Sequence, residues 1–290
     1  MAEEMQETLA TAAQLRPLIA LLEDESPVVR NALRERFTAW LPHLPEMLQT
    51  SGVELSTEQE QQLEAILEPG RREALLAHWG QWHWMPQADQ QLEEGLDQLC
   101  CHLNGWRTTR GELSRRLDSL AEAAMKECGR VDLYELSQWL FTPQRDHARL
   151  RGNGRHFYSS QNSNLIAVIE SGLGNPISLC CIYRLVGQRF GLQIGGCNFP
   201  GHFLASVIYG GQRWLVDCYN RGRFMLAEDV ARHHPAANPA LADVVRRDAE
   251  VDQILLRCLR NLDEACERSG SEALRPLLRQ LVLSLMGGCP

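Results

Sequence analysis

The chain has 290 residues, of which 44% are hydrophobic, and a formal net charge of −8. This length allows one large or two modest domains with a packed core, and the acidic balance argues against nucleic acid or an anionic membrane as the main partner. No stretch approaches the about eighteen apolar residues of a membrane-spanning helix. The first residues also lack the basic-then-apolar pattern of a secretory signal, so we expect a cytoplasmic protein.

Ten cysteines are present, and none forms a CxxC pair or lies at zinc-finger spacing from a histidine. We therefore expect reduced thiols that act mostly as small core residues. Neither a metal nor a cofactor is expected.

Apolar residues recur at helical spacing through residues 7–125, which predicts a helical N-terminal region with a boundary near residue 125. The segment "LLEDESPVVRNAL" is similar to the turn of a HEAT repeat, in which an acidic residue, Pro and Val-Arg recur. A helical-repeat scaffold, with the function in this region, is one alternative that follows.

The segment 145–164 is rich in Gly, Asn, Ser and Arg, which predicts a long ordered loop. Arg151 and Arg155 could meet an anionic group there. Asn162 and Asn164 are expected to cap the short helix over 165–174 and to hold the loop against the sheet.

"GNPISLCCIYRL" begins a predicted helix over 175–190, with Asn175 as N-cap and Pro176 at the first helical position. Apolar residues cover nearly its whole circumference, which indicates a buried helix. Ser178 lies in the first turn, where the free N–H groups and the helix dipole favour negative charge. Cys180 and Cys181 are expected to be core residues.

Period-two runs follow in "LQIGGCNF", "HFLASVIY", "RWLVDCYN" and "RFMLA", and Gly210-Gly211 predicts a hairpin between the second and third. The chain becomes helical again from about 241 to 286. Helices, an antiparallel sheet and helices in this order predict an α+β fold. His202 and Asp217 come from neighbouring strands, so we expect them to be hydrogen-bonded.

The order of helix, His strand and Asp strand resembles the transglutaminase-like superfamily, and more narrowly the bacterial SirB-one-type family. "NPISL", "FPGHFLASV" and "WLVDCYNRGR" carry this resemblance, which spans about residues 145–224. It implies a papain-like core over 126–235 and C-terminal helices over 236–290, in which 254–270 is a shortened remnant of tetratricopeptide-type helices.

Carried over by residue, the resemblance makes His202 the base and Asp217 its orienter. The family's nucleophile falls near 176–178, where this chain has Pro, Ile and Ser. The candidate triad is therefore Ser178, His202 and Asp217, with Cys181 as an alternative nucleophile. Arg151, Arg155, Asn162 and Asn175 are candidate binding residues.

Beside the helical-repeat scaffold, two functional hypotheses follow from the resemblance. The first is a non-catalytic protein-interaction or regulatory module, a pseudoenzyme whose former cleft binds a protein or peptide partner. The alternative is a hydrolase or acyl transferase that uses Ser178 or Cys181 with His202 and Asp217. Neither hypothesis includes a nucleic-acid or membrane partner.

Overall fold

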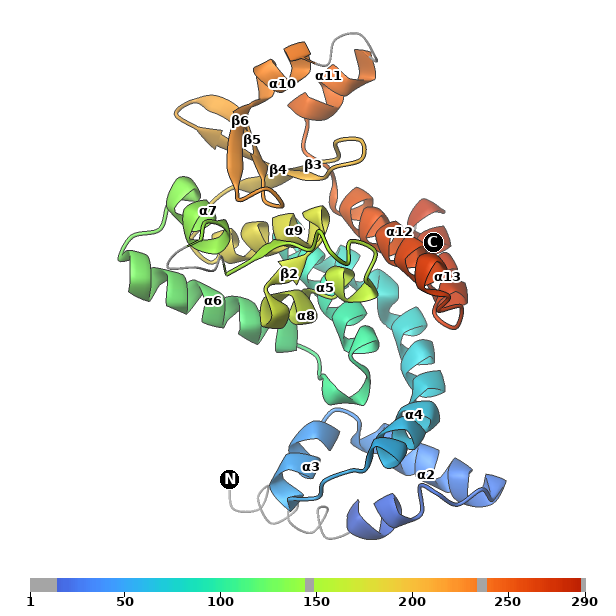
Figure 1. Cartoon of the computed structure of the whole chain (residues 1–290). Helices are drawn as coiled ribbons and strands as arrows, with labels where there is room; N and C mark the ends of the chain where they lie inside the picture. Colours follow the sequence, from blue (N-terminus) through green and yellow to red (C-terminus); the bar gives the residue numbers. More distant parts are fainter. Residues whose placement is uncertain (1–14, 144–148, 234–238, 288–290) are drawn as a thin grey trace. The chain divides into compact units, whose positions relative to one another are not determined.

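A computed structural model describes residues 15–143, 149–233 and 239–287, and Figure 1 shows its helices and strands. The first fourteen residues, which bear on the expected lack of a secretory signal, and Pro235 of the expected linker lie outside the described residues. The chain divides into two compact units. Unit 1 comprises residues 1–78 with 98–112, and unit 2 comprises residues 79–97 with 113–290.

Unit 1 is helical, as its apolar spacing predicts. It contains α2 (Pro27–Trp40), α3 (Leu44–Ser51) and α4 (Thr57–His78). Their apolar faces share one core, which includes Leu22, Leu33, Phe37, Leu44, Leu63, Leu67 and Trp106.

Unit 2 begins with further helices and short turns. In chain order these are η1 (Trp79–Trp84), α5 (Ala88–Leu103), η2 (Gly105–Arg107), α6 (Glu112–Cys128), α7 (Leu133–Phe141), β1 (Arg151–Gly152), η3 (Ser160–Ser163), α8 (Leu165–Ser171) and β2 (Leu173–Gly174); η2 and the end of α5 belong to unit 1. The expected loop before α8 is present. β1 also pairs with β2 in parallel, and this contact anchors the loop beside the start of the next helix.

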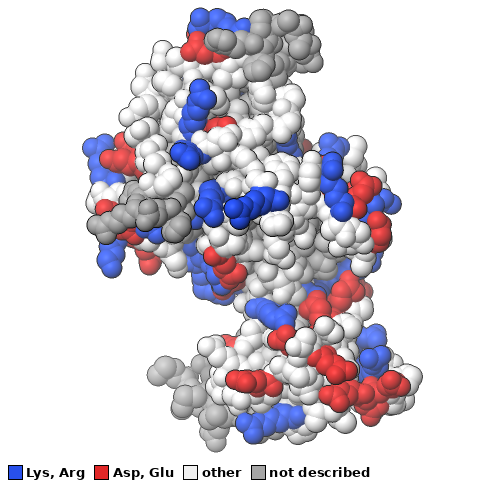
Figure 2. Space-filling model, viewed as in Figure 1, with Lys and Arg blue, Asp and Glu red and all other residues white. Residues whose placement is uncertain are grey.

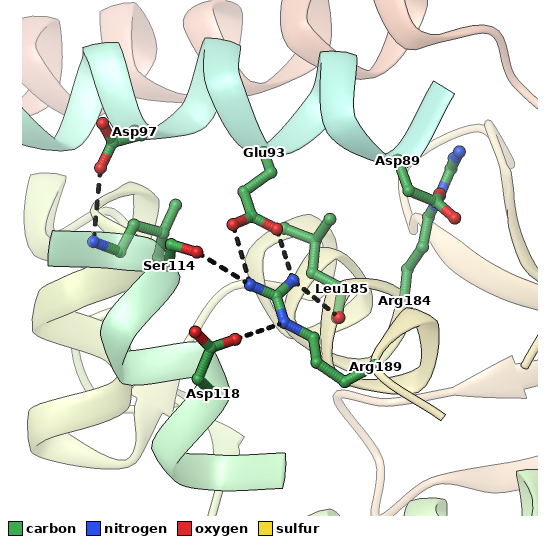
Figure 3. A network of polar contacts seen from close by, with 9 residues as sticks. Asp89, Glu93, Asp97, Ser114, Asp118, Arg184, Leu185 and Arg189 are labelled. Carbon is green, nitrogen blue, oxygen red and sulfur yellow. Dashed lines mark hydrogen bonds and ion pairs between the residues drawn. The ribbon is translucent and has the colours of Figure 1, made fainter. Parts of the chain in front are cut away.

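The helix expected over 175–190 is α9 (Pro176–Gln188), and all but two of its residues are buried. One of the two is Gln188 at its end; the other is Arg184, which forms an ion pair with Asp89 of α5. Just after the helix, Arg189 contacts Glu93 of α5 and Asp118 of α6 (Figure 3). The charged groups at this end of α9 thus bind it to the neighbouring helices.

A four-stranded antiparallel sheet in the order β3-β4-β5-β6 follows α9. Its strands are β3 (Ile194–Cys197), β4 (Leu204–Tyr209), β5 (Gln212–Asp217) and β6 (Arg223–Leu226). Gly210 and Gly211 close the β4–β5 hairpin, as predicted, with φ of 59° and 74°. Both angles lie in the left-handed region that a tight two-residue turn requires and that glycine adopts without strain.

The two faces of the sheet are covered by different helices, with α9 on one side and α10 (Ala227–His233) and α11 (Pro239–Arg246) on the other (Figure 1). On the first face Ile194 packs closely against Gly187 of α9. A Cβ atom added at Gly187 would lie only 2.4 Å from the Cδ1 atom of Ile194. On the second face Leu204 and Leu215 form a core cluster with Val245. The α+β architecture expected from the sequence is confirmed.

Two long helices end the described chain, α12 (Val251–Ser269) and α13 (Arg275–Met286), and they pack against each other. No helix in the described part of the chain is long and apolar enough to cross a membrane. On the face drawn in Figure 2, basic and acidic side chains are interspersed with uncharged surface.

Candidate functional site

The first element of the site is the pair His202 and Asp217. Asp217 is the last residue of β5, and His202 lies in the loop that leads into β4. The Nε2 atom of His202 lies 2.8 Å from Oδ1 of Asp217, which confirms the hydrogen bond expected from the sequence. Asn220 also holds the carboxylate, because its backbone N–H donates to Oδ1 and its side-chain amide donates to Oδ2.

The surroundings keep Asp217 ionised and orient the imidazole. Burial alone would raise the pKa of Asp217, but the hydrogen bonds from His202 and Asn220 outweigh it and hold the pKa below its ordinary value. The Tyr219 ring packs edge-on against the imidazole, with 5.8 Å between centroids. The side chain of His202 remains 31% exposed, so the pair is both fixed and accessible.

The pair opens into a pocket of about 590 Å³. The alternation along β5 and the register with β6 place Asp217 on the same sheet face as Leu215 and Met225, toward α10. The other lining residues are Phe199, Leu204, Trp214, Arg223, Phe224, Leu226, Asp229 and Val230. None of these lining residues is a Ser, Thr, Cys or Lys, so the base has no nucleophilic side chain in its own pocket.

Ser178 belongs to a different local structure, the capping box at the start of α9. Its backbone N–H donates to Oδ1 of Asn175 at 2.9 Å, and its hydroxyl donates to the backbone carbonyl of Asn175 at 3.0 Å. The same hydroxyl oxygen lies 3.1 Å from the Asn175 N–H, which donates to it. Ser178 is 1% exposed. Its hydroxyl therefore satisfies the end of a buried helix.

Replacing Ser178 with Ala should lower the free energy of unfolding by about 0.5–2 kcal/mol, the usual cost of losing a capping hydroxyl. Chemical denaturation followed by circular dichroism measures the change. Ser119→Ala is the matched control, since this exposed hydroxyl donates to the carbonyl of Arg115, one turn earlier in α6. Equal stability of Ser178→Ala and the wild type would show that the capping box contributes nothing.

The two adjacent thiols of α9 are buried, as the sequence predicts, with Cys180 3% and Cys181 2% exposed. The sulfur of Cys180 lies 3.7 Å from the carbonyl oxygen of Phe203, the residue after His202, and close to the Cys218 thiol, the residue after Asp217. Burial, and then the hydrogen bond with Cys218, raises the pKa of Cys180 well above its ordinary value. A thiol in this state is protonated and is a poor nucleophile.

A second and larger pocket, of about 740 Å³, lies at the start of α9. The first residues of the helix line it together with the 157–163 loop, the 198–203 loop and one face of α12. These lining residues include Asn175, Pro176, Ile177, Phe157, Tyr158, Asn198, Gly201, Phe203, Arg257, Arg260 and Asn261. In the 198–203 loop, Gly201 and Phe203 face this pocket while His202 faces the other. The fold therefore places the start of α9 and the His–Asp pair in separate pockets.

The remaining candidate residues have the following positions. Arg151 and Arg155 are exposed and line neither of the two pockets. Asn162 is 2% exposed; it donates to the carbonyls of His156 and Phe157 and accepts from Asn153, so it braces the loop. Asn164, rather than Asn162, is the N-cap of α8.

Sequence reasoning missed the arginines of α12. Arg257 and Arg260 are three residues apart on a helix, so they share one face, and both line the larger pocket. The three-residue spacing of the arginines in "LLRCLRN" indicates that they share a helix face, but it does not show which other segment of the chain lies against that face. Across the residues that the structure describes, no group of three His, Cys, Asp or Glu side chains is placed to hold a metal ion.

Comparison with known proteins places the chain among relatives. A UPF0162 protein of Xylella fastidiosa (strain Temecula1) is 39% identical over 118 residues, which are 38% of this chain and 42% of that protein. Human F-box only protein 21 is 25% identical over 146 residues, 46% of this chain and 22% of that protein. A UPF0162 protein of Vibrio cholerae is 29% identical over 62 residues, 21% of this chain and 23% of that protein.

These alignments span less than half the length of each of these relatives. No solved structure matches the chain. A family model described as the transglutaminase-like superfamily matches residues 108–260, more than half of the chain, and this range includes α9, the sheet and α12 up to Arg260. The chain therefore belongs to the transglutaminase-like superfamily.

Proposed function

We propose that this protein is a non-catalytic binding member of its superfamily, an interaction or regulatory module that holds a peptide in the pocket at the start of α9. The observation that carries the proposal is the capping box. The hydroxyl of Ser178 donates to the Asn175 carbonyl and is buried, so it offers no proton to the imidazole of His202. Nucleophilic catalysis requires the attacking group and its base within hydrogen-bond reach.

The thiols of α9 support the same conclusion. Cys180 and Cys181 are buried. The environment of Cys180 also favours the neutral thiol, because burial and then the hydrogen bond with Cys218 raise its pKa. The alternative nucleophile Cys181 has no route to a substrate in either pocket, since it lines neither.

The larger pocket suits a ligand better than it suits a reaction. Its volume of about 740 Å³ falls within the range usual for ligand sites, and its lining combines apolar side chains with a few convergent polar ones. Phe157 and Tyr158 lie at it with 40% and 42% of their surface exposed. The guanidinium of Arg268 lies on the Tyr158 ring, 3.8 Å from its centroid, so the Phe157 ring is the surface offered to an apolar side chain of a partner. The predicted tetratricopeptide-type origin of α12 is part of this proposal, since α12 forms one wall and packs on α13.

A substrate panel tests the proposal. Peptide, ester and amide substrates are incubated with the wild type and with the Ser178→Ala and His202→Ala variants. We expect no turnover by the wild type beyond that of the two variants. Turnover that disappears in both variants would overturn the proposal.

The second candidate function, acyl transfer or hydrolysis, rests on the intact pair His202 and Asp217. The pair is hydrogen-bonded at 2.8 Å and opens to solvent, the arrangement of a base with its orienter. For this function Ser178 would have to leave its capping box, which is why the panel includes both variants. Turnover by the wild type that is lost in the Ser178→Ala, His202→Ala and Asp217→Asn variants would establish the second function.

A further inference from the structure

The larger pocket contains a positive charge that no carboxylate of the described residues neutralises. Arg257 of α12 reaches across the pocket, and its Nη1 atom donates to Oδ1 of Asn198 at 2.5 Å and to the carbonyl of Phe199 at 3.0 Å. Its guanidinium lies 5.7 Å from the centroid of the Phe203 ring. Both oxygen partners are neutral, so they orient the guanidinium and leave its charge uncompensated.

The partial burial of this charge is costly without an anion. The side chain is half-buried, and burial lowers the pKa of Arg257 below its ordinary value. Among the described residues, most arginines buried to this degree pair with acids, as Arg189 does with Glu93. A guanidinium removed from water without a carboxylate favours an anionic ligand, to which its remaining N–H groups can donate in a fork.

Arg260 adds a second charge one turn further along α12. It is exposed, lines the same pocket and forms no ion pair with a described residue. Glu264 is the acidic side chain of the pocket lining, and both N–H groups that Arg268 directs at it, from Nε and Nη2, bind its Oε1 atom. The acid of the pocket is thus already paired, and the pocket is left with net positive charge.

We propose that Arg257 and Arg260 bind the anionic group of a peptide, a carboxylate or a phosphoryl group, in the pocket at the start of α9. This inference rests on the proposed function and specifies the chemistry of its ligand. The exposed ring of Phe157 lies at the same pocket, so the ligand we propose has an apolar residue next to the anionic one. The positive end of the α9 dipole adds a favourable field for the same charge.

A synthetic peptide array identifies the anionic source. Each peptide is made in three versions that differ at one position, with Glu, Gln or phosphoserine, beside an apolar residue. We expect the wild type to bind Glu or phosphoserine versions and to bind their Gln versions more weakly. A preference for phosphoserine over Glu assigns a phosphoryl ligand, and the reverse assigns a carboxylate. Equal binding of all three versions, or no binding at all, would overturn the inference.

Variants then test the two arginines with the best peptide, by fluorescence anisotropy. Arg260→Ala should weaken binding about tenfold, as expected for the loss of one charged hydrogen bond, and Arg257→Met should weaken it at least as much. Arg279→Ala is the matched control, because it removes the same charge from the exposed face of α13 and does not line the pocket. Circular dichroism checks that each variant is folded, and exposed Arg260 keeps the test decisive if Arg257→Met does not fold.

Unchanged affinity in Arg260→Ala and Arg257→Met would overturn the inference, as would an equal loss in Arg279→Ala. These results are distinguishable from failure of the proposed function. Catalysis appears as turnover in the substrate panel, whereas a wrong ligand class appears as binding without preference for the anionic versions.

Discussion

Replacing Arg189 with Met should lower the free energy of unfolding of unit 2 by about 3 kcal/mol. The guanidinium of Arg189 makes a paired contact with Glu93, in which Nη2 donates to Oε1 at 2.8 Å, and its Nε donates to Asp118 at 2.9 Å (Figure 3). Nη2 also donates to the hydroxyl of Ser114 at 3.2 Å. The side chains of Arg189 and Glu93 are only 15% and 19% exposed, so the substitution strands a partly buried carboxylate.

The pKa of Arg189 supports the expected size of this effect. Burial alone would lower the pKa, but the hydrogen bonds to Glu93 and Asp118 outweigh it, so the pKa lies above its ordinary value. The surroundings therefore favour the charged form of the arginine. Arg189 lies at the C-terminal end of α9, a helix whose start lines the larger pocket and whose side packs against the sheet. Loss of the Arg189 contacts should therefore also make the positions of the residues that line both pockets less well defined.

Urea denaturation followed by circular dichroism measures the change. Arg232→Met is the matched control, since its side chain is 71% exposed and its pairing with Asp229 lies on the surface of α10. The control should change stability by less than about 1 kcal/mol. In a double variant, Glu93→Gln should recover part of the loss, because it removes the stranded charge. Equal effects of Arg189→Met and Arg232→Met would contradict the role assigned to this network.

Unit 1 should lose up to about 3 kcal/mol of stability as the pH falls from about 6.5 to about 4. Burial, followed by the charges of Arg71 and Arg72, lowers the pKa of His102 to about 4. Its Nδ1 atom is buried and has no hydrogen-bond partner among the described residues. The folded state therefore holds the imidazole neutral, whereas the unfolded state takes up a proton below about pH 6.5. Protonation across this window favours unfolding.

Thermal denaturation of the wild type and of His102→Leu across this pH range tests the assignment. The variant cannot be protonated at this position, so its stability should fall less than that of the wild type. His78→Leu is the control, because the His78 ring is exposed on α4 and its loss should leave the acid-induced fall in place. If His102→Leu and the wild type lose stability in parallel, the fall has another origin.

Much of the fold of unit 2 is predictable from local pattern. Asn175 and Pro176 mark the start of α9, and the apolar residues around its circumference predict its burial, because a helix end and an apolar surface are local properties. The period-two runs and Gly210-Gly211 predict the hairpin. Since antiparallel strands joined by a two-residue turn have a set register, His202 and Asp217 are predicted to lie near each other as well, and their hydrogen bond is present.

The boundaries of the elements are less well predicted. The strand expected to begin at His202 begins at Leu204. His202 stays in the loop, where Tyr219 packs against its ring and the side chain can turn to meet Asp217. The loop before α8 also contains a parallel pairing of Arg151–Gly152 with Leu173–Gly174. The sequence around either segment does not indicate that the other is its partner.

By itself the sequence determined that a buried helix with Ser178 in its first turn precedes a hairpin whose open end brings His202 close to Asp217. Only the tertiary structure decided that His202 and Asp217 line one pocket while Asn175, Pro176 and Ile177 line another. Side-chain periodicity defines the faces of an element, but the element that covers each face depends on packing between distant segments. The placement of α10 against the Asp217 face and of Arg257 beside Asn198 is of this kind. For this reason the lining of the two pockets follows from the fold and not from the sequence pattern.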